Sequence, residues 1–215
     1  MTGIADEGMD PRQHERSGTR ALDDWTKTIV EAQDVVAPDR IERLALALGV
    51  EPPVHEEPLS PLWHWLLFLP ATARTETGDD GHPRRGGFLP PLPHRRRMYA
   101  GGRLEFHAPI PIGANVTRRG EIVDITEKAG RSGDIVLVSV RYEITCDGRP
   151  AITEHQELVY TDSPPKPVAA EADKLLPPAR WVDTVVTDEV LLFRFSALTH
   201  NSHRIHYEPQ LCDRD

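Results

Sequence analysis

The stretch IVLVSVRYEITCDGRPAITEHQELVY, residues 135–160, decides the fold. On both sides of Asp147-Gly148, apolar and polar residues alternate, which is the pattern of a strand with one buried face. An Asp-Gly pair between two such runs is a strong hairpin signal, because both residues tolerate the positive φ of a tight turn. Similar alternation starts near Arg103 and continues through 116–125. The sequence therefore predicts a strongly twisted antiparallel sheet.

One short amphipathic helix is predicted ahead of this sheet. Residues 37–39 place a proline and an acid in a first helical turn, which is typical of a helix start. Apolar residues then recur at helical spacing between Ile41 and Leu48, and Gly49 is suited to the C-cap. Residues 25–30 indicate a strand or an extended lead-in. Together these elements predict the α+β fold class.

Composition excludes several classes of protein. The formal net charge of −9 argues against a general nucleic-acid binder. The chain has no run of about 18 apolar residues, so no transmembrane helix is expected. Cys146 and Cys212 form neither a CxxC pair nor a disulfide framework. The simplest interpretation is a cytoplasmic protein without a membrane partner.

The chain divides at its polar and proline-rich segments. Residues 1–20 are predicted to be a disordered tail, and residues 163–180 a proline-rich linker. The long Gly- and Pro-rich connection at 72–97 either covers a site or is a surface insertion. Residues 181–186 resemble 25–30, and a helix-like apolar stretch follows, which indicates a weak internal duplication.

Residues 200–206 are the likeliest place for chemistry. This segment packs three histidines and one asparagine directly after the apolar run 190–193. Such groups are costly beside apolar surface unless they are solvated, paired or used. His200, His203 and His206 recur every three residues and could share a helix face that binds zinc. No carboxylate or cysteine at fixed spacing completes a known metal signature, so no metal is expected.

Five motifs agree in order with one protein family: residues 65–68, 86–91, 97–103, 130–133 and 193–207. They resemble the MaoC-like hydratases, in the branch of hydroxyacyl-thioester dehydratase type 2 and mesaconyl-C4-CoA hydratase. The resemblance implies a double hot-dog fold, in which each half is an antiparallel sheet wrapped around a central helix. Residues 21–162 would then be the N-terminal hot-dog domain. Residues 181–215 would begin a second hot-dog, carrying the catalytic motif and apparently truncated.

The family motif Asp-x-Asn-Pro-(Ile or Leu)-His stands at the start of the second hot-dog helix. Laid on this chain without a gap, its catalytic Asp falls on Asn201 and its catalytic His on His206. Asn cannot act as a base, so Asn201 would orient a water molecule. His206 would be the general acid/base, and His203 is the alternative for that role. Backbone N–H groups near Ser202 could stabilise the thioester oxygen.

Six further residues are candidates for substrate binding: Gly87, Phe88, Leu89, Arg97, Arg118 and Arg204. Arg97 and Arg118 could bind the phosphates of coenzyme A, because guanidinium groups recognise phosphate bidentately. Phe88 and Leu89 would line the acyl pocket, or else belong to the core. Arg204 would hold a pocket carboxylate or form a buried salt bridge.

The resemblance implies an enzyme that reversibly adds water to an enoyl-CoA or related acyl thioester. No cofactor is expected, because coenzyme A is part of the substrate. An alternative is a non-catalytic or incomplete subunit that binds acyl thioesters or pairs with a partner chain. The same fold also supports thioesterases. A homodimer or higher homo-oligomer is expected, because the apolar face of 190–198 is left exposed unless another chain packs there.

Overall fold

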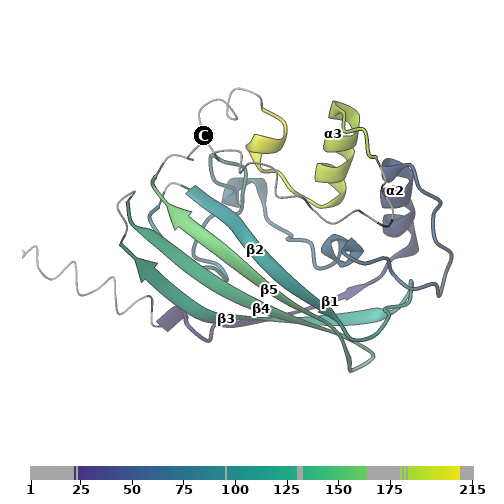
Figure 1. Ribbon diagram of the computed structural model, residues 1–215, viewed down its shortest axis with the longest axis horizontal. Helices are drawn as coiled ribbons and strands as arrows, with labels where there is room; N and C mark the ends of the chain where they lie inside the picture. The colour runs from purple at the N-terminus through teal and green to yellow at the C-terminus, as the bar shows by residue number, and fades with distance from the viewer. Residues whose placement is uncertain are drawn as a thin grey trace, which may run out of the picture.

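The computed structural model describes residues 22, 24–94, 96–129, 133–163, 180, 182 and 184–208. Its centre is an antiparallel sheet of five strands in the order β1-β3-β4-β5-β2 (Figure 1). The strands are β1 (Ile29–Val35), β2 (Arg96–Phe106), β3 (Asn115–Lys128), β4 (Ile135–Cys146) and β5 (Arg149–Thr161). The sequence prediction of an antiparallel sheet is therefore confirmed.

The hairpin between β4 and β5 forms where the Asp-Gly pair predicts it. Asp147 has a φ of 48° and Gly148 a φ of 75°, the left-handed conformations that a tight hairpin turn requires. Along β4, Val136, Val138 and Val140 are buried and the residues between them are not. This alternation confirms that one face of the sheet carries the core.

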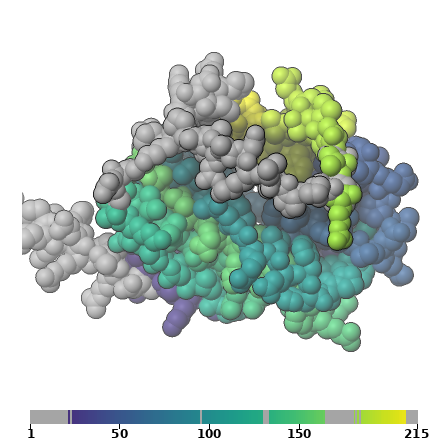
Figure 2. Space-filling view, viewed as in Figure 1, coloured from purple at the N-terminus to yellow at the C-terminus, as the bar shows by residue number. Residues whose placement is uncertain are grey.

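Two helices lie on the same side of the sheet, α2 (Pro38–Leu48) and α3 (Glu189–Leu198) (Figure 1). Helix α2 ends at Gly49, whose φ of 73° confirms the predicted C-cap. Its buried residues are Ile41, Leu44 and Ala45, of which Ile41 and Leu44 pack into a core cluster with residues of β3, β4 and β5. The space-filling view places α3 above the sheet beside the α2 region (Figure 2).

Helix α3 presents apolar side chains to the solvent. The N-cap is Asp188, whose carboxylate accepts a hydrogen bond of 2.7 Å from the Leu191 N–H. Val190 and Phe193 are nevertheless 59% and 72% exposed. The predicted exposure of this apolar helical face is thus confirmed for the part of the chain that the structure describes.

Some element boundaries differ from the sequence expectations. Strand β1 starts at Ile29 rather than near Trp25, because Lys27 has a φ of 73° and turns the chain first. The apolar segment 62–69 forms a short 3-10 helix, η1 (Trp63–Leu66). Strand β2 extends back to Arg96, where it pairs with the end of β5. These boundaries depend on strand partners, which local patterns do not reveal.

The second copy of the proposed duplication shows no strand in the residues that the structure describes. Within 181–186, residues 182 and 184–186 are described and have no regular secondary structure. The predicted disordered tail at 1–20 lies outside the described residues, as do residues 164–179 of the predicted linker. None of the described helices is long and apolar enough to cross a membrane.

Asp34 connects β1 to the segment that follows η1. Its carboxylate accepts hydrogen bonds from the backbone N–H of Phe68 at 2.7 Å and from Arg40 at 2.9 Å. Burial acts to raise the pKa of Asp34, but these hydrogen bonds outweigh it and the pKa is lowered. The carboxylate therefore holds the segment around Phe68 against the sheet.

We expect Asp34→Ala to lower the free energy of unfolding at pH 7 by about 1–3 kcal/mol, because it leaves the Phe68 N–H without its acceptor and Arg40 without its carboxylate partner. Because the folded-state pKa is depressed, this stabilisation is present above the usual carboxyl pKa and disappears as pH falls through the folded-state value. Urea unfolding at pH 7 and at pH 3 measures both effects. Asp39→Ala is the control, since its pair with Arg43 is 69% exposed on each side. An equal loss of unfolding free energy in Asp34→Ala and Asp39→Ala would contradict the role assigned to the Asp34 carboxylate.

Candidate functional site

The segment singled out by its histidines, residues 200–208, follows α3 instead of opening a helix. Helix α3 ends at Leu198, and the segment contains only the single-turn 3-10 helix η3 (Arg204–His206). The His203 N–H donates to Asn201 Oδ1 at 3.2 Å. The expected oxyanion site at a helix start near Ser202 is therefore not formed, because no helix of useful length begins there in the described chain.

The loop 77–83 meets this segment directly, although about 120 residues separate them in sequence. The Arg204 N–H donates to the carbonyl oxygen of Asp80 at 2.9 Å. Ser202 Oγ donates to the carbonyl oxygen of Gly81 at 2.5 Å, and Arg204 Nη1 donates to that of Asp79 at 2.8 Å. These contacts show that part of the 72–97 connection packs against the motif segment; that it covers a site stays a prediction.

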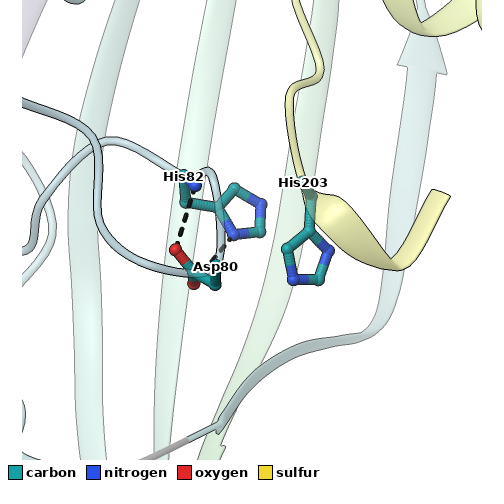
Figure 3. A group of neighbouring side chains, drawn as sticks. All are labelled: Asp80, His82 and His203. Atoms are coloured by element: carbon teal, nitrogen blue, oxygen red, sulfur yellow. Dashed lines mark hydrogen bonds and ion pairs between the residues drawn. The ribbon is translucent and has the colours of Figure 1, made fainter. Parts of the chain in front are cut away.

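Two histidines and an aspartate come together at this junction (Figure 3). The rings of His82 and His203 stack with their centroids 4.1 Å apart and their planes inclined by 26°. Asp80 Oδ2 lies 3.2 Å from His82 Nδ1, and Asp80 Oδ1 accepts from the His82 N–H at 3.0 Å. His206 completes the group, with its ring set edge-on to His203 at 5.8 Å.

The surroundings keep His82 neutral near pH 7. Burial lowers the pKa of His82 to about 4, and the positive charges of Arg97 and His203 act in the same direction. Asp80 opposes this shift without reversing it. Burial acts to raise the pKa of Asp80, but its hydrogen bonds with His82 bring the pKa below the usual value. The pair is thus a neutral imidazole held by a carboxylate, facing the His203 ring.

Asn201 lines a cavity of about 440 Å³ between α3 and the 70–83 loop. Its Oδ1 accepts a hydrogen bond from the His203 N–H, and its amide Nδ2 is the donor that it offers to a ligand. His203 connects the two residues of the catalytic motif, because its backbone binds Asn201 and its ring contacts His206. The structure therefore brings Asn201, His203 and His206 into one group.

The three-histidine helical face is not formed. His200 lies at the end of α3, where its Nδ1 is 3.4 Å from the carbonyl oxygen of Pro70. Asp80, His82 and His203 instead offer donor atoms within 4.8 Å of one another, and two imidazoles with a carboxylate are donors that Zn²⁺ accepts. A cation there would have to replace the existing contact between Asp80 and His82 Nδ1.

Three of the six substrate-binding candidates, Arg204, Phe88 and Leu89, have other contacts in the structure. Arg204 uses Nε and Nη2 on Glu208, at 2.7 and 2.8 Å, in addition to its bond with Asp79. Arg204 therefore forms a salt bridge, but not the buried one of the prediction, because its side chain is 38% exposed. Phe88 and Leu89 pack against the core cluster under the sheet, and the Phe88 ring is 6.2 Å from that of Tyr142. A Cβ added at Gly87 would meet no heavy atom within 4 Å.

The two arginine candidates lie in different cavities. Arg97 lines a small cavity of about 170 Å³ with Asp80 and His82, close to the histidine group. Arg118 lines a larger cavity of about 470 Å³ on the inner face of the sheet. Both positions are compatible with ligand contact, and their role in binding stays a prediction.

Sequence reasoning missed two pairs of residues. Asp80 and His82 belong to a loop that sequence reasoning described only by its glycines and prolines. The run Asp-Gly-His-Pro at 80–83 nevertheless places a carboxylate and an imidazole two residues apart. The other pair is buried: His64 Nε2 lies 3.3 Å from Glu154 Oε2, with both side chains at most 4% exposed. Burial acts to raise the pKa of Glu154, but hydrogen bonds from His64, Gln156 and Trp65 lower it. Only the strand register could have revealed this second pair.

Comparison with known families agrees with these motifs. The family model of hydroxyacyl-thioester dehydratase type 2 matches residues 62–215. The chain belongs to this family. Mesaconyl-C(4)-CoA hydratase of Chloroflexus aurantiacus is 47% identical over 173 residues, which cover 78% of this chain and 61% of that protein. The chain thus spans less than two thirds of this relative's length.

Solved structures with the same fold are MaoC-like dehydratases. The MaoC-like dehydratase of Phytophthora capsici aligns with a TM-score of 0.58 and 12% identity, covering 91% of this chain and 69% of that one. HtdX of Mycobacterium tuberculosis aligns with a TM-score of 0.55 and 16% identity, covering 86% and 66%. The hot-dog fold expected from the family motifs is therefore confirmed.

Proposed function

We propose that this family member is a hydro-lyase that adds water reversibly to the double bond of an enoyl-CoA or related acyl thioester. The observation that carries the proposal is the junction of the motif segment with the 77–83 loop, where Asn201, His203 and His206 adjoin His82 and Asp80. The relative named mesaconyl-C(4)-CoA hydratase supports the same reaction class.

The chemistry needs a base for water, a proton donor for the α carbon and a polar group that orients the water. An imidazole can fill the first two roles, because it titrates near neutral pH. In this proposal His206 is the acid/base and the Nδ2 of Asn201 holds the water. His203 is positioned by stacking on His82, which Asp80 fixes in turn. Coenzyme A enters only as part of the substrate, and no further cofactor is used.

Hydration of crotonyl-CoA and mesaconyl-CoA tests the proposal. Loss of the conjugated-thioester absorbance on adding the full chain is the expected result, with no release of free thiol. Thiol release would instead identify a thioesterase. Binding of the thioester with no change in absorbance would overturn the hydratase and leave a binding subunit.

The second candidate, a subunit that needs a partner, is favoured by one observation. Phe193 and Val190 on α3 are more than half exposed, which is unusual for apolar side chains grouped on one helix. A homodimer or higher homo-oligomer would cover them. Light scattering of the full chain tests this, and a monomer with full hydration activity would contradict it. A cytoplasmic location stays a prediction.

A further inference from the structure

A second cavity, which reaches the motif segment at Thr199, is lined in part by Arg118. This cavity of about 470 Å³ lies between the inner face of the sheet and the segment after η1, and Thr199 at the end of α3 forms part of its wall. Pro70 belongs both to this wall and to that of the Asn201 cavity. The two cavities are therefore neighbours, with Pro70 between them.

Arg118 projects from β3 into this cavity between two aromatic rings. Its guanidinium carbon is 4.9 Å from the ring centroid of Phe68 and 5.0 Å from that of Tyr142. Burial lowers the pKa of Arg118, but an arginine remains cationic at neutral pH. The two rings hold the guanidinium by cation–π contacts and leave the edges that carry its N–H groups for a planar acceptor.

The acidic groups that attract Arg118 are already engaged elsewhere. Glu154 and Asp34 are the carboxylates whose charges act on it. Glu154 accepts from Trp65 at 3.1 Å and from Gln156 at 2.7 Å, besides its contact with His64. Asp34 is bound to Arg40 and to the backbone. Within the described ranges, no carboxylate lies within ion-pair distance of the Arg118 guanidinium.

One atom of a buried histidine in the same cavity is without a hydrogen-bond partner. His64 lines the cavity and its side chain is 2% exposed, yet its Nδ1 has no hydrogen-bond partner among the described residues. Buried polar atoms are nearly always hydrogen-bonded to protein, water or ligand. The unpartnered Nδ1 of His64 and the cationic Arg118 in one cavity indicate that its occupant is polar rather than a plain hydrocarbon chain.

We infer that Arg118 binds a free carboxylate at the far end of the acyl group. Arg118 would then be the residue that selects the monothioester of an unsaturated dicarboxylic acid over a simple enoyl thioester, an inference that rests on the proposed hydration activity. A carboxylate fits because its two oxygens match the guanidinium fork, and its single charge neutralises the cation. A phosphate of coenzyme A fits less well, since its greater charge would be more costly to take out of water.

The test compares two thioesters of coenzyme A on Arg118→Met. One carries a terminal carboxylate, such as the monothioester of mesaconic acid, and the other is crotonyl-CoA. We expect kcat/KM for the carboxylated substrate to fall by about 10²-fold or more, while that for crotonyl-CoA changes only a few-fold. Arg118→Lys, which keeps the charge but not the fork, should lie between wild type and Arg118→Met.

Arg119→Met is the matched control, because it is the neighbouring residue on β3 and carries the same change. Arg119 lies outside this cavity and pairs with Glu121 at 2.8 Å. Arg119→Met should leave the ratio of kcat/KM for the carboxylated thioester to kcat/KM for crotonyl-CoA unchanged. Equal losses on both substrates in Arg118→Met, with an unchanged melting temperature, would overturn the carboxylate assignment. If those losses disappear with pantetheine thioesters, Arg118 serves a phosphate of coenzyme A.

Failure of the proposed function can be separated from failure of this inference. If the wild-type chain hydrates neither substrate, calorimetry of the two thioesters replaces the activity assay. Tighter binding of the carboxylated thioester by wild type, lost in Arg118→Met and kept in Arg119→Met, supports the carboxylate site without any turnover. Equal affinity of wild type and Arg118→Met for that thioester would overturn it.

Discussion

His206→Ala is expected to lower the kcat of hydration by about 10²–10⁴-fold, the usual contribution of a positioned general acid/base. His206 occupies the motif position that carries the catalytic imidazole, and it is half-buried with its ring against His203. Stopped-flow or steady-state absorbance of the conjugated thioester measures the loss. His107→Ala is the control, because His107 is an exposed histidine bonded to Thr153 on the sheet.

The same assay decides between the two imidazoles. If His203 only positions the group, His203→Ala should cost less in kcat than His206→Ala, and His82→Ala should resemble His203→Ala. The reason is that His203 stacks on His82 while its backbone holds Asn201. A full loss in His203→Ala beside an almost unchanged His206→Ala would reverse the roles. Wild-type kcat in both His203→Ala and His206→Ala would show that these two histidines take no part in the reaction.

Gly81→Ala is expected to reduce hydration by about 10²-fold or more, since a shift of about 1 Å at a site can cost that much. Gly81 has a φ of 87°, which disfavours any residue with a Cβ. An added Cβ would also collide with the backbone carbonyl of Ser202. The loop would have to move away from the motif segment and carry Asp80 and His82 with it.

Measurement of kcat together with the melting temperature distinguishes a local shift from unfolding. Gly101→Ala is the matched control, because a Cβ there meets no heavy atom within 4 Å and its φ is not positive. We expect Gly81→Ala to lose activity while retaining most of its melting temperature, since the sheet core lies elsewhere. Wild-type activity in Gly81→Ala would show that the junction of loop and motif is not needed for the chemistry.

The sequence determined the elements whose pattern is local. The alternation on both sides of Asp147-Gly148 predicted the β4–β5 hairpin, and the spacing from Ile41 to Gly49 predicted α2 with its cap. Both follow from the period of the buried face and from residues suited to positive φ. The order of the motifs predicted the family, and the cluster of histidines at 200–206 indicated the candidate site.

Only the tertiary structure decided what surrounds that segment. Gly81 and Ser202 meet although 121 positions separate them, and no local pattern encodes such a contact. Arg118 and Arg119 look alike in sequence, yet one enters a cavity between aromatic rings and the other pairs with Glu121. A strand sends neighbouring side chains to opposite faces, and packing alone decides which face encloses the cavity.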